Sequence, residues 1–170
     1  MSQVPPWFER QFSFGFPVEQ YPNLCIRLRG TPARLEEMLR GIPSDLLLRK
    51  TGDQWSAQEH AGHLLDLESL WMARVDDFLA GGEILTLADL TNRKTYEANH
   101  NGRALTEIQA EFRKERQRLV DRLVTFEAGL FRRSMLHPRL KKPMRLVDHL
   151  FFVAEHDDHH LARIWEMIHA

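Results

Sequence analysis

Helical periodicity is the feature of this sequence that most restricts its fold. Four segments, at residues 32–41, 56–81, 105–126 and 145–170, repeat apolar side chains every three or four positions. A half-buried strand would instead alternate apolar and polar residues, and no segment does so convincingly. The sequence therefore predicts an all-α protein built as a bundle of four principal helices.

The predicted helix ends have recognisable sequence signals. Thr31 is a polar cap before Pro32, which suits the first position of a helix. Ser56 and Glu59 have the spacing of a capping box, and the following helix ends at the glycine pair after residue 80. These signals predict that the first helix starts at residue 32 and that the second runs unbroken from residue 56 to 81.

The segments outside the helices differ in composition. Residues 1–30 contain four prolines among several aromatic residues, which predicts an irregular arm packed on the bundle. Residues 83–104 are mixed, with a short helix expected near 87–96, and "HPRLKKPM" (137–144) is expected to be a loop. No boundary divides the chain, so we expect a single domain over residues 1–170.

Composition and charge limit the classes of function. The net charge is −1 with histidine neutral, which offers no basic excess for nucleic acid, so a small-molecule or protein partner is expected. No apolar run is long enough to span a membrane, and the first residues do not resemble a signal peptide, so the expected location is the cytoplasm. Cys25 is the single cysteine, and any metal site must therefore use histidines and carboxylates.

The last predicted helix carries the run "EHDDHH" at residues 155–160. At about 100° per residue, its apolar residues share one face, and His156 and His160 lie beside that face. Side chains four residues apart on a helix are neighbours and can converge on one ion. His159 is expected to point further from the core. Asp157 falls within the apolar face, where an ionised carboxylate is costly unless a charge balances it.

A third candidate ligand lies on the second helix. His63 borders the apolar face of that helix as His156 borders its own. Three neutral imidazoles leave open positions on a divalent ion, which suits a site that binds water or substrate. A carboxylate could orient one of these rings through its second nitrogen, and the candidates are Glu59, Asp66 and Asp157.

Structural explanations compete with each of these assignments. A histidine at the edge of a core is often only hydrogen-bonded there, Glu59 has the spacing of a capping residue, and Asp66 could be solvated. Trp55 and Trp71 are expected to be core residues, and the run "RKER" (113–116) is expected to face solvent. Pattern alone leaves a metal site as one hypothesis among several.

Over residues 30–168 the sequence resembles the DinB-like superfamily. The resemblance rests on "WSAQEHAGHLLDLE", "HPRLKKP" and "EHDDHHLARI". It implies an up-down-down-up four-helix bundle in which a divalent ion, most often zinc or nickel, with iron or another metal as alternatives, is held by histidines that match His63, His156 and His160. It also implies a metal-dependent enzyme, either a transferase that uses a low-molecular-weight thiol or a hydrolase of small molecules.

The substrate contacts and the assembly are less constrained. Arg74 lies on the His63 side of its helix, and Tyr96 and His100 lie in the segment least similar to the superfamily, so these three are candidate pocket residues. Bundles of this sort often pair through helix faces, and a homodimer is expected.

Two other functions remain open from the sequence. His156 and Asp157 could be the His-Asp pair of a helical phosphohydrolase, although that pattern needs a later aspartate and none follows Asp158. The chain could also be a non-catalytic metal- or ligand-binding stress-response protein with structural histidines. An open coordination position facing a pocket would favour an enzyme.

Overall fold

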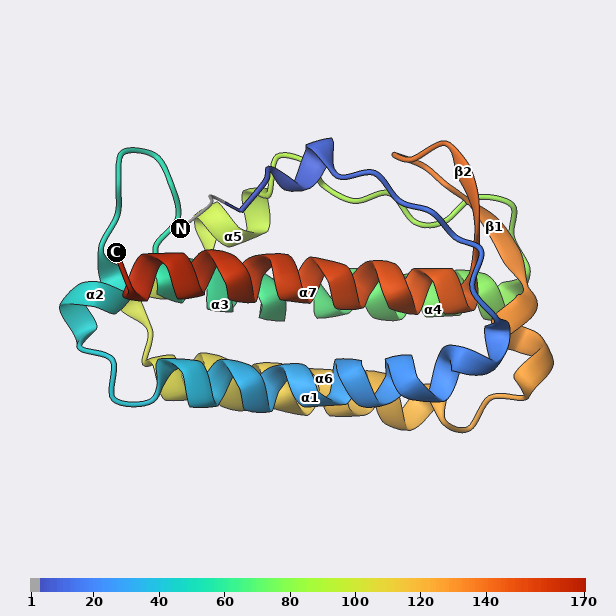
Figure 1. The fold of residues 1–170 in the computed structure, drawn as a ribbon, viewed down its shortest axis with the longest axis horizontal. Coiled ribbons are helices and arrows are strands. Elements are labelled where there is room, and N and C mark those ends of the chain that lie inside the picture. The colour runs from blue at the N-terminus through green and yellow to red at the C-terminus, as the bar shows by residue number, and fades with distance from the viewer. Residues whose placement is uncertain (1–3) are drawn as a thin grey trace.

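The computed structural model describes residues 4–170, so residues 1–3 of the predicted arm lie outside the described residues. Four long helical stretches form a bundle (Figure 1): α1 (Tyr21–Leu39), α3 (Ala57–Asp66) continued by α4 (Glu68–Ala80), α6 (Leu105–Leu123) and α7 (Leu146–Ile168). α1 and α7 run in one direction, and α3, α4 and α6 run in the other. The predicted all-α, up-down-down-up bundle is confirmed.

The second helical stretch starts and ends as its sequence predicts. The Ser56 hydroxyl accepts a hydrogen bond from the Glu59 amide, and the Glu59 carboxylate accepts one from the Ser56 amide, which completes the capping box. Gly81 ends α4 in the left-handed conformation, with φ 74°. The one irregularity is Leu67 between α3 and α4, whose backbone stays in the right-handed helical region.

The first helix is longer than predicted. α1 begins at Tyr21 instead of residue 32, and Pro32 lies inside it. Thr31 does not cap this helix, because its hydroxyl donates to Asp157 at 2.8 Å in the buried interior. Buried side chains continue the apolar stripe back through the first half of α1, at Leu24 and Leu28. Packing of that stripe outweighs the local preference of proline for a helix start.

The short elements lie at the ends of the bundle and, in the case of α5, against α3. They are α2 (Ser44–Leu48), α5 (Arg93–Glu97) and a two-stranded antiparallel hairpin of β1 (Ser134–His137) and β2 (Lys142–Arg145). The hairpin corrects the prediction that 137–144 is a loop, and α5 is shorter than the helix expected over 87–96. The hairpin leads directly into α7, and its strand β1 ends at His137 beside the cavity described below.

The N-terminal segment crosses the bundle along α7 before it turns into α1 (Figure 1). It contains two single-turn 3-10 helices, Trp7–Glu9 and Val18–Gln20. The Trp7 ring packs edge-on against Phe152 of α7 at 5.3 Å and against Phe12 at 5.3 Å. Among residues 4–170, no helix combines the length and the hydropathy that a bilayer span requires.

Buried charge separates two apolar clusters in the core. One cluster includes Trp71 and Val153, and the other includes Leu64 and Leu161. Between them along the helices lie Glu68, Arg116 and Asp157, all at most 4% exposed. Charged side chains this deeply buried need partners, and their partners distinguish the structural and functional parts of the interior.

Candidate metal centre

Three buried histidines converge between α3 and α7. His63, His156 and His160 each offer one ring nitrogen, and these nitrogens all lie within 4.8 Å of one another. Nε2 of His156 lies 3.1 Å from Nε2 of His160, and the ring of His63 is centred 5.4 Å and 4.7 Å from those two rings. The structure thus brings together the three histidines chosen from the sequence.

A hydroxyl and a carboxylate orient His63. Its Nδ1 lies 2.9 Å from the hydroxyl of Thr95 in α5, and that hydroxyl donates to Asp66 at 2.9 Å. Because the Thr95 hydrogen goes to Asp66, the hydroxyl oxygen accepts from His63 Nδ1–H, which leaves Nε2 unprotonated. Asp66 therefore acts through Thr95, a residue that the sequence interpretation did not select.

His100 closes this arrangement from the following 3-10 turn. Its Nε2 lies 2.8 Å from Asp66, and its ring is 1% exposed, so it supports the site and does not line the cavity. Gly62 makes this approach possible, because a Cβ at that position would lie 2.2 Å from Cγ of His100. The glycine next to His63 is thus required by the ring that packs on it.

Another histidine, His60, pairs with His160. The two Nδ1 atoms are 2.8 Å apart in the interior, and only one of them can carry the hydrogen. With Nε2 of His160 free to act as a ligand, Nδ1 carries the hydrogen and donates it to His60. The sequence interpretation missed His60, although it lies three residues from His63 and its ring could have been placed near the same face.

The histidines are uncharged at neutral pH. Burial lowers the pKa of His63 to about 4 and that of His60 to about 3. Burial also holds the pKa of His156 and of His160 well below the usual range of histidine. Neutral imidazoles are the form that binds a divalent cation, so the donor set is ready for a metal without loss of protons.

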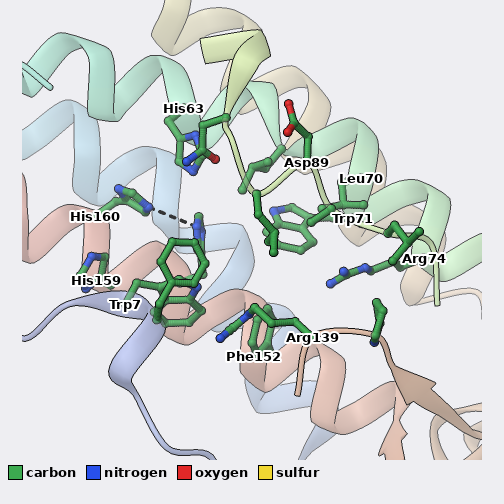
Figure 2. Close-up of a pocket in the computed structure, with 18 of the residues that line it drawn as sticks. Trp7, His63, Leu70, Trp71, Arg74, Asp89, Arg139, Phe152, His159 and His160 are labelled. Carbon is green, nitrogen blue, oxygen red and sulfur yellow. Dashed lines mark hydrogen bonds between the residues drawn. The ribbon is translucent and has the colours of Figure 1, made fainter. Parts of the chain in front are cut away.

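A cavity of about 340 Å³ adjoins the three histidines. Figure 2 shows His63 and His160 on one side of it and Trp71, Phe152 and Arg74 on the other. Its wall also includes Trp55 and Trp7, and the Trp7 ring packs edge-on against His156 at 5.1 Å. Trp55 and Trp71 were expected to be core residues only, but both line this cavity.

A family model described as the DinB superfamily matches residues 27–164. The chain belongs to the DinB superfamily. Among solved structures it is similar to YfiT from Bacillus subtilis, with a TM-score of 0.81, 20% sequence identity, and coverage of 94% of this chain and 91% of that chain. YfiT is described as a probable metal-dependent hydrolase with an unusual four-helix bundle topology. No curated protein matches the sequence.

Two of the predicted supporting carboxylates do not contact the histidines of this DinB-superfamily chain. Glu59 accepts from Lys50 at 2.9 Å as well as from the Ser56 amide, so its contacts are those of a cap. Asp157 is fully buried and accepts from Arg116 and Thr31. It therefore faces away from the histidine cluster, and a His-Asp pair with His156 is not formed.

Arg116 corrects the prediction for the run "RKER". This residue is 0% exposed, although solvent exposure was expected, and its side chain donates to Glu68 at 2.6 Å and to Asp157 at 3.1 Å. Helical periodicity places position 116 on the same buried face as Phe112 and Leu119. The prediction was wrong because it assigned every residue of the charged run to the surface.

The three predicted pocket residues have different locations. Arg74 lines the cavity and is 2% exposed. Tyr96 is 61% exposed and packs edge-on against Trp55 at 5.7 Å, and it is absent from the cavity wall formed by residues 4–170. Since His100 supports Asp66, Arg74 alone of the three borders the cavity.

Proposed function

We propose that this chain is a metal-dependent enzyme in which His63, His156 and His160 hold one divalent ion beside a cavity for a small organic substrate. The observation that carries the proposal is the convergence of three buried, neutral imidazole nitrogens at one end of that cavity. The description of YfiT as a probable metal-dependent hydrolase supports the same class of function.

The surroundings of the histidines fit such an ion. Thr95 and His60 each occupy the Nδ1 of a ligand ring and leave its Nε2 directed at the shared centre. Three histidine nitrogens suit zinc, nickel or ferrous iron, and we propose zinc or nickel first. When bound, a divalent ion there would supply positive charge that lowers the pKa of a neighbouring water or thiol and makes it a nucleophile at neutral pH.

The nucleophile comes from outside the chain. Cys25 is buried in α1, and burial raises the pKa of its thiol to about 11, so it does not supply a thiolate. Water gives a hydrolase, and a low-molecular-weight thiol gives a thiol-dependent transferase. The residues around the cavity then position the substrate and exclude bulk water from it, with the aromatic rings of Trp7, Trp55 and Trp71 forming much of the wall.

Metal analysis tests the ligand set. Purified protein should carry close to one divalent ion per chain, and His63→Ala, His156→Ala or His160→Ala should each lose it. His159→Ala is the matched control, because His159 neighbours His160 but lies outside the group of three converging nitrogens. Full metal content in all three ligand variants, or a loss in His159→Ala as large as in His160→Ala, would contradict the assignment.

Turnover separates the two reactions. Small esters and amides test hydrolysis, and glutathione, bacillithiol or mycothiol with an electrophile tests thiol transfer, each with and without removal of the ion by a chelator. Metal-dependent turnover of either class supports the enzyme. A chain that binds the ion tightly and turns over neither class favours a non-catalytic binding or stress-response protein. A homodimer and a cytoplasmic location stay predictions, and light scattering of the purified protein tests the first.

A further inference from the structure

Two arginine side chains border the cavity without a carboxylate partner. Arg74 of α4 donates through Nε to the carbonyl of Thr86 at 3.0 Å. Arg139, at the turn of the β hairpin, has a buried Nη2 that makes no hydrogen bond within residues 4–170. Neither guanidinium forms an ion pair in that part of the chain, although 2% exposure of Arg74 places its charge well inside the protein. An unpaired cation at the depth of Arg74 is costly and points to a missing anion.

Hydrogen-bond donors also outnumber acceptors around His137. The amide of Leu140 lies 3.1 Å from its Nδ1, and Nη1 of Arg74 lies 3.2 Å from its Nε2. A neutral imidazole has one acceptor nitrogen, so it can accept from only one of these two donors. Whichever tautomer forms, an N–H group in this cluster lacks an acceptor, and an anionic oxygen would supply one.

The local charge is positive. Burial first, and then the charges of Arg74 and Arg139, lower the pKa of His137 to about 3, so this ring adds no charge of its own. Burial lowers the pKa of Arg74 to about 10, which leaves it a cation at neutral pH. Asp77 offsets part of this charge, but its carboxylate accepts from the Thr86 amide at 2.6 Å.

One carboxylate lines the cavity itself. It is Asp89, whose oxygens accept from the amides of Thr91 at 2.9 Å and Arg93 at 3.0 Å. Arg74 and Arg139 therefore leave an excess of one positive charge on the cavity wall. A carboxylate carries one negative charge and has the planar shape that a guanidinium binds through paired hydrogen bonds, which favours it over a doubly charged phosphate.

Aromatic surface connects the arginines to the histidines. The Trp71 ring is centred 5.6 Å from the ring of His156 and 5.6 Å from Cζ of Arg74. Cζ of Arg139 lies 5.8 Å from the ring of Phe152 (Figure 2). A molecule that contacts an arginine and a histidine of this cavity therefore passes over an apolar, aromatic surface.

We propose that the cavity binds a small organic carboxylate, with its anionic group against Arg74 and Arg139 and its apolar part over Trp71. The reacting group then lies toward His63, His156 and His160. The position of the reacting group rests on the proposed function, whereas the anion-binding end depends only on the two arginines. The substrate class is thus a compact carboxylic acid with a short apolar or aromatic body, consistent with a cavity of about 340 Å³.

Calorimetric titration of metal-free protein tests this subsite. The probe is phenylacetate, compared with its neutral amide, phenylacetamide, and with phenyl phosphate. Phenylacetate should bind at least about tenfold more tightly than the amide, because only the anion makes charge-assisted hydrogen bonds. Equal affinity for acid and amide, or tighter binding of phenyl phosphate, overturns the carboxylate assignment.

Arg139→Gln is the first variant, because the buried Nη2 makes no hydrogen bond within residues 4–170 that the substitution would break. It should weaken phenylacetate about tenfold and leave phenylacetamide unchanged. Arg74→Gln should do the same, with circular dichroism to confirm that it folds. The matched control is Arg118→Gln, on the outer face of α6 in an ion pair with Glu115. Unchanged phenylacetate binding in Arg139→Gln overturns the subsite.

His63→Ala separates this proposal from the metal-dependent function. Phenylacetate should bind to metal-free His63→Ala within about twofold of its affinity for metal-free wild type. Binding that appears only when the metal is present would place the anion on the ion and overturn the arginine subsite. Metal that stays fully bound in His63→Ala, with phenylacetate binding intact, would instead contradict the proposed function alone.

Discussion

Arg116 and Arg74 are both buried arginines, but their surroundings are opposite. Arg116 is 0% exposed and donates to Glu68, Asp157 and the carbonyl of Leu28. Arg74 is 2% exposed and has one carbonyl and one histidine ring as partners. One cation has two carboxylate partners, and the other, at the wall of a cavity, forms no ion pair within residues 4–170.

The difference separates structural from functional buried charge. The Arg116 network joins all four long helical stretches, because Glu68 is on α4, Asp157 on α7 and Leu28 on α1. Such a closed network has no capacity left for a ligand. A buried arginine that has carboxylate partners is therefore structural, whereas one that has none is a candidate for ligand binding. Burial or charge alone does not distinguish the two.

The strongest test of this comparison is Arg116→Leu. Removing the guanidinium leaves two buried carboxylates unpaired, so the free energy of unfolding should fall by about 3–5 kcal/mol. Urea denaturation followed by circular dichroism measures the change. Arg118→Leu, on the exposed side of the same helix, should change stability by less than about 0.5 kcal/mol. A loss below about 1 kcal/mol in Arg116→Leu would show that the network is not structural.

Thr95→Val tests the orientation of His63. It keeps the size of the side chain but removes the hydroxyl between His63 and Asp66. Metal affinity, measured by competition with a chromogenic chelator, should fall about 10- to 100-fold. Thr125→Val is the control, since its hydroxyl donates only to the carbonyl of Arg122 at the end of α6. Equal affinities in the two variants would remove Thr95 from the site.

Acid stability of the metal-free protein tests the neutral histidines. The pKa of His63 is about 4 in the folded chain and about 6.5 when unfolded, so between these values the unfolded state binds the additional proton. Stability should therefore decrease as the pH falls from 6.5 to 4. His63→Gln should reduce that slope by at most about 1.4 kcal/mol per pH unit, as measured by urea denaturation at several pH values.

The smallest expected effect concerns Arg139. Because its buried Nη2 has no hydrogen-bond partner among residues 4–170, Arg139→Gln should lower the free energy of unfolding by no more than about 0.5 kcal/mol. Thermal and urea unfolding measure this value. A loss comparable to that of Arg116→Leu would mean that Arg139 has a structural partner, and the contrast between the two regions would fail.

The sequence predicted the bundle because helical periodicity and capping are local. Ser56 and Glu59 define a helix start within four residues, and the structure has that cap. The predicted start of α1 at residue 32 was wrong. Pro32 is a local signal for a helix start, but the packing of apolar residues before it, which depends on the tertiary structure, extends the helix back to Tyr21. The hairpin at residues 134–145 was missed because its strands are four residues each, too short for an alternating pattern to be clear.

The convergence of His63, His156 and His160 followed from helical spacing together with the resemblance to the superfamily. Their supporting residues could not be found in the same way. Thr95 reaches His63 from another helix, and His60 pairs with a histidine far along the chain. The location of Asp157 in the interior was predicted correctly, but its partner was not, because Arg116 belongs to a charged run that is typical of a surface.

Gly62 and His100 of this chain form a packed pair next to the proposed metal-binding histidines. A side chain larger than hydrogen at position 62 would collide with the ring of His100. That ring is hydrogen-bonded to Asp66, the carboxylate that also accepts from Thr95. A related chain that keeps His100 but has a larger residue at position 62 must place that ring differently, which would change the hydrogen bonds of Asp66 and, through Thr95, the orientation of His63. Comparing positions 62 and 100 together across homologues would therefore separate members that share this support for His63 from members that keep the three histidines but orient them by other contacts.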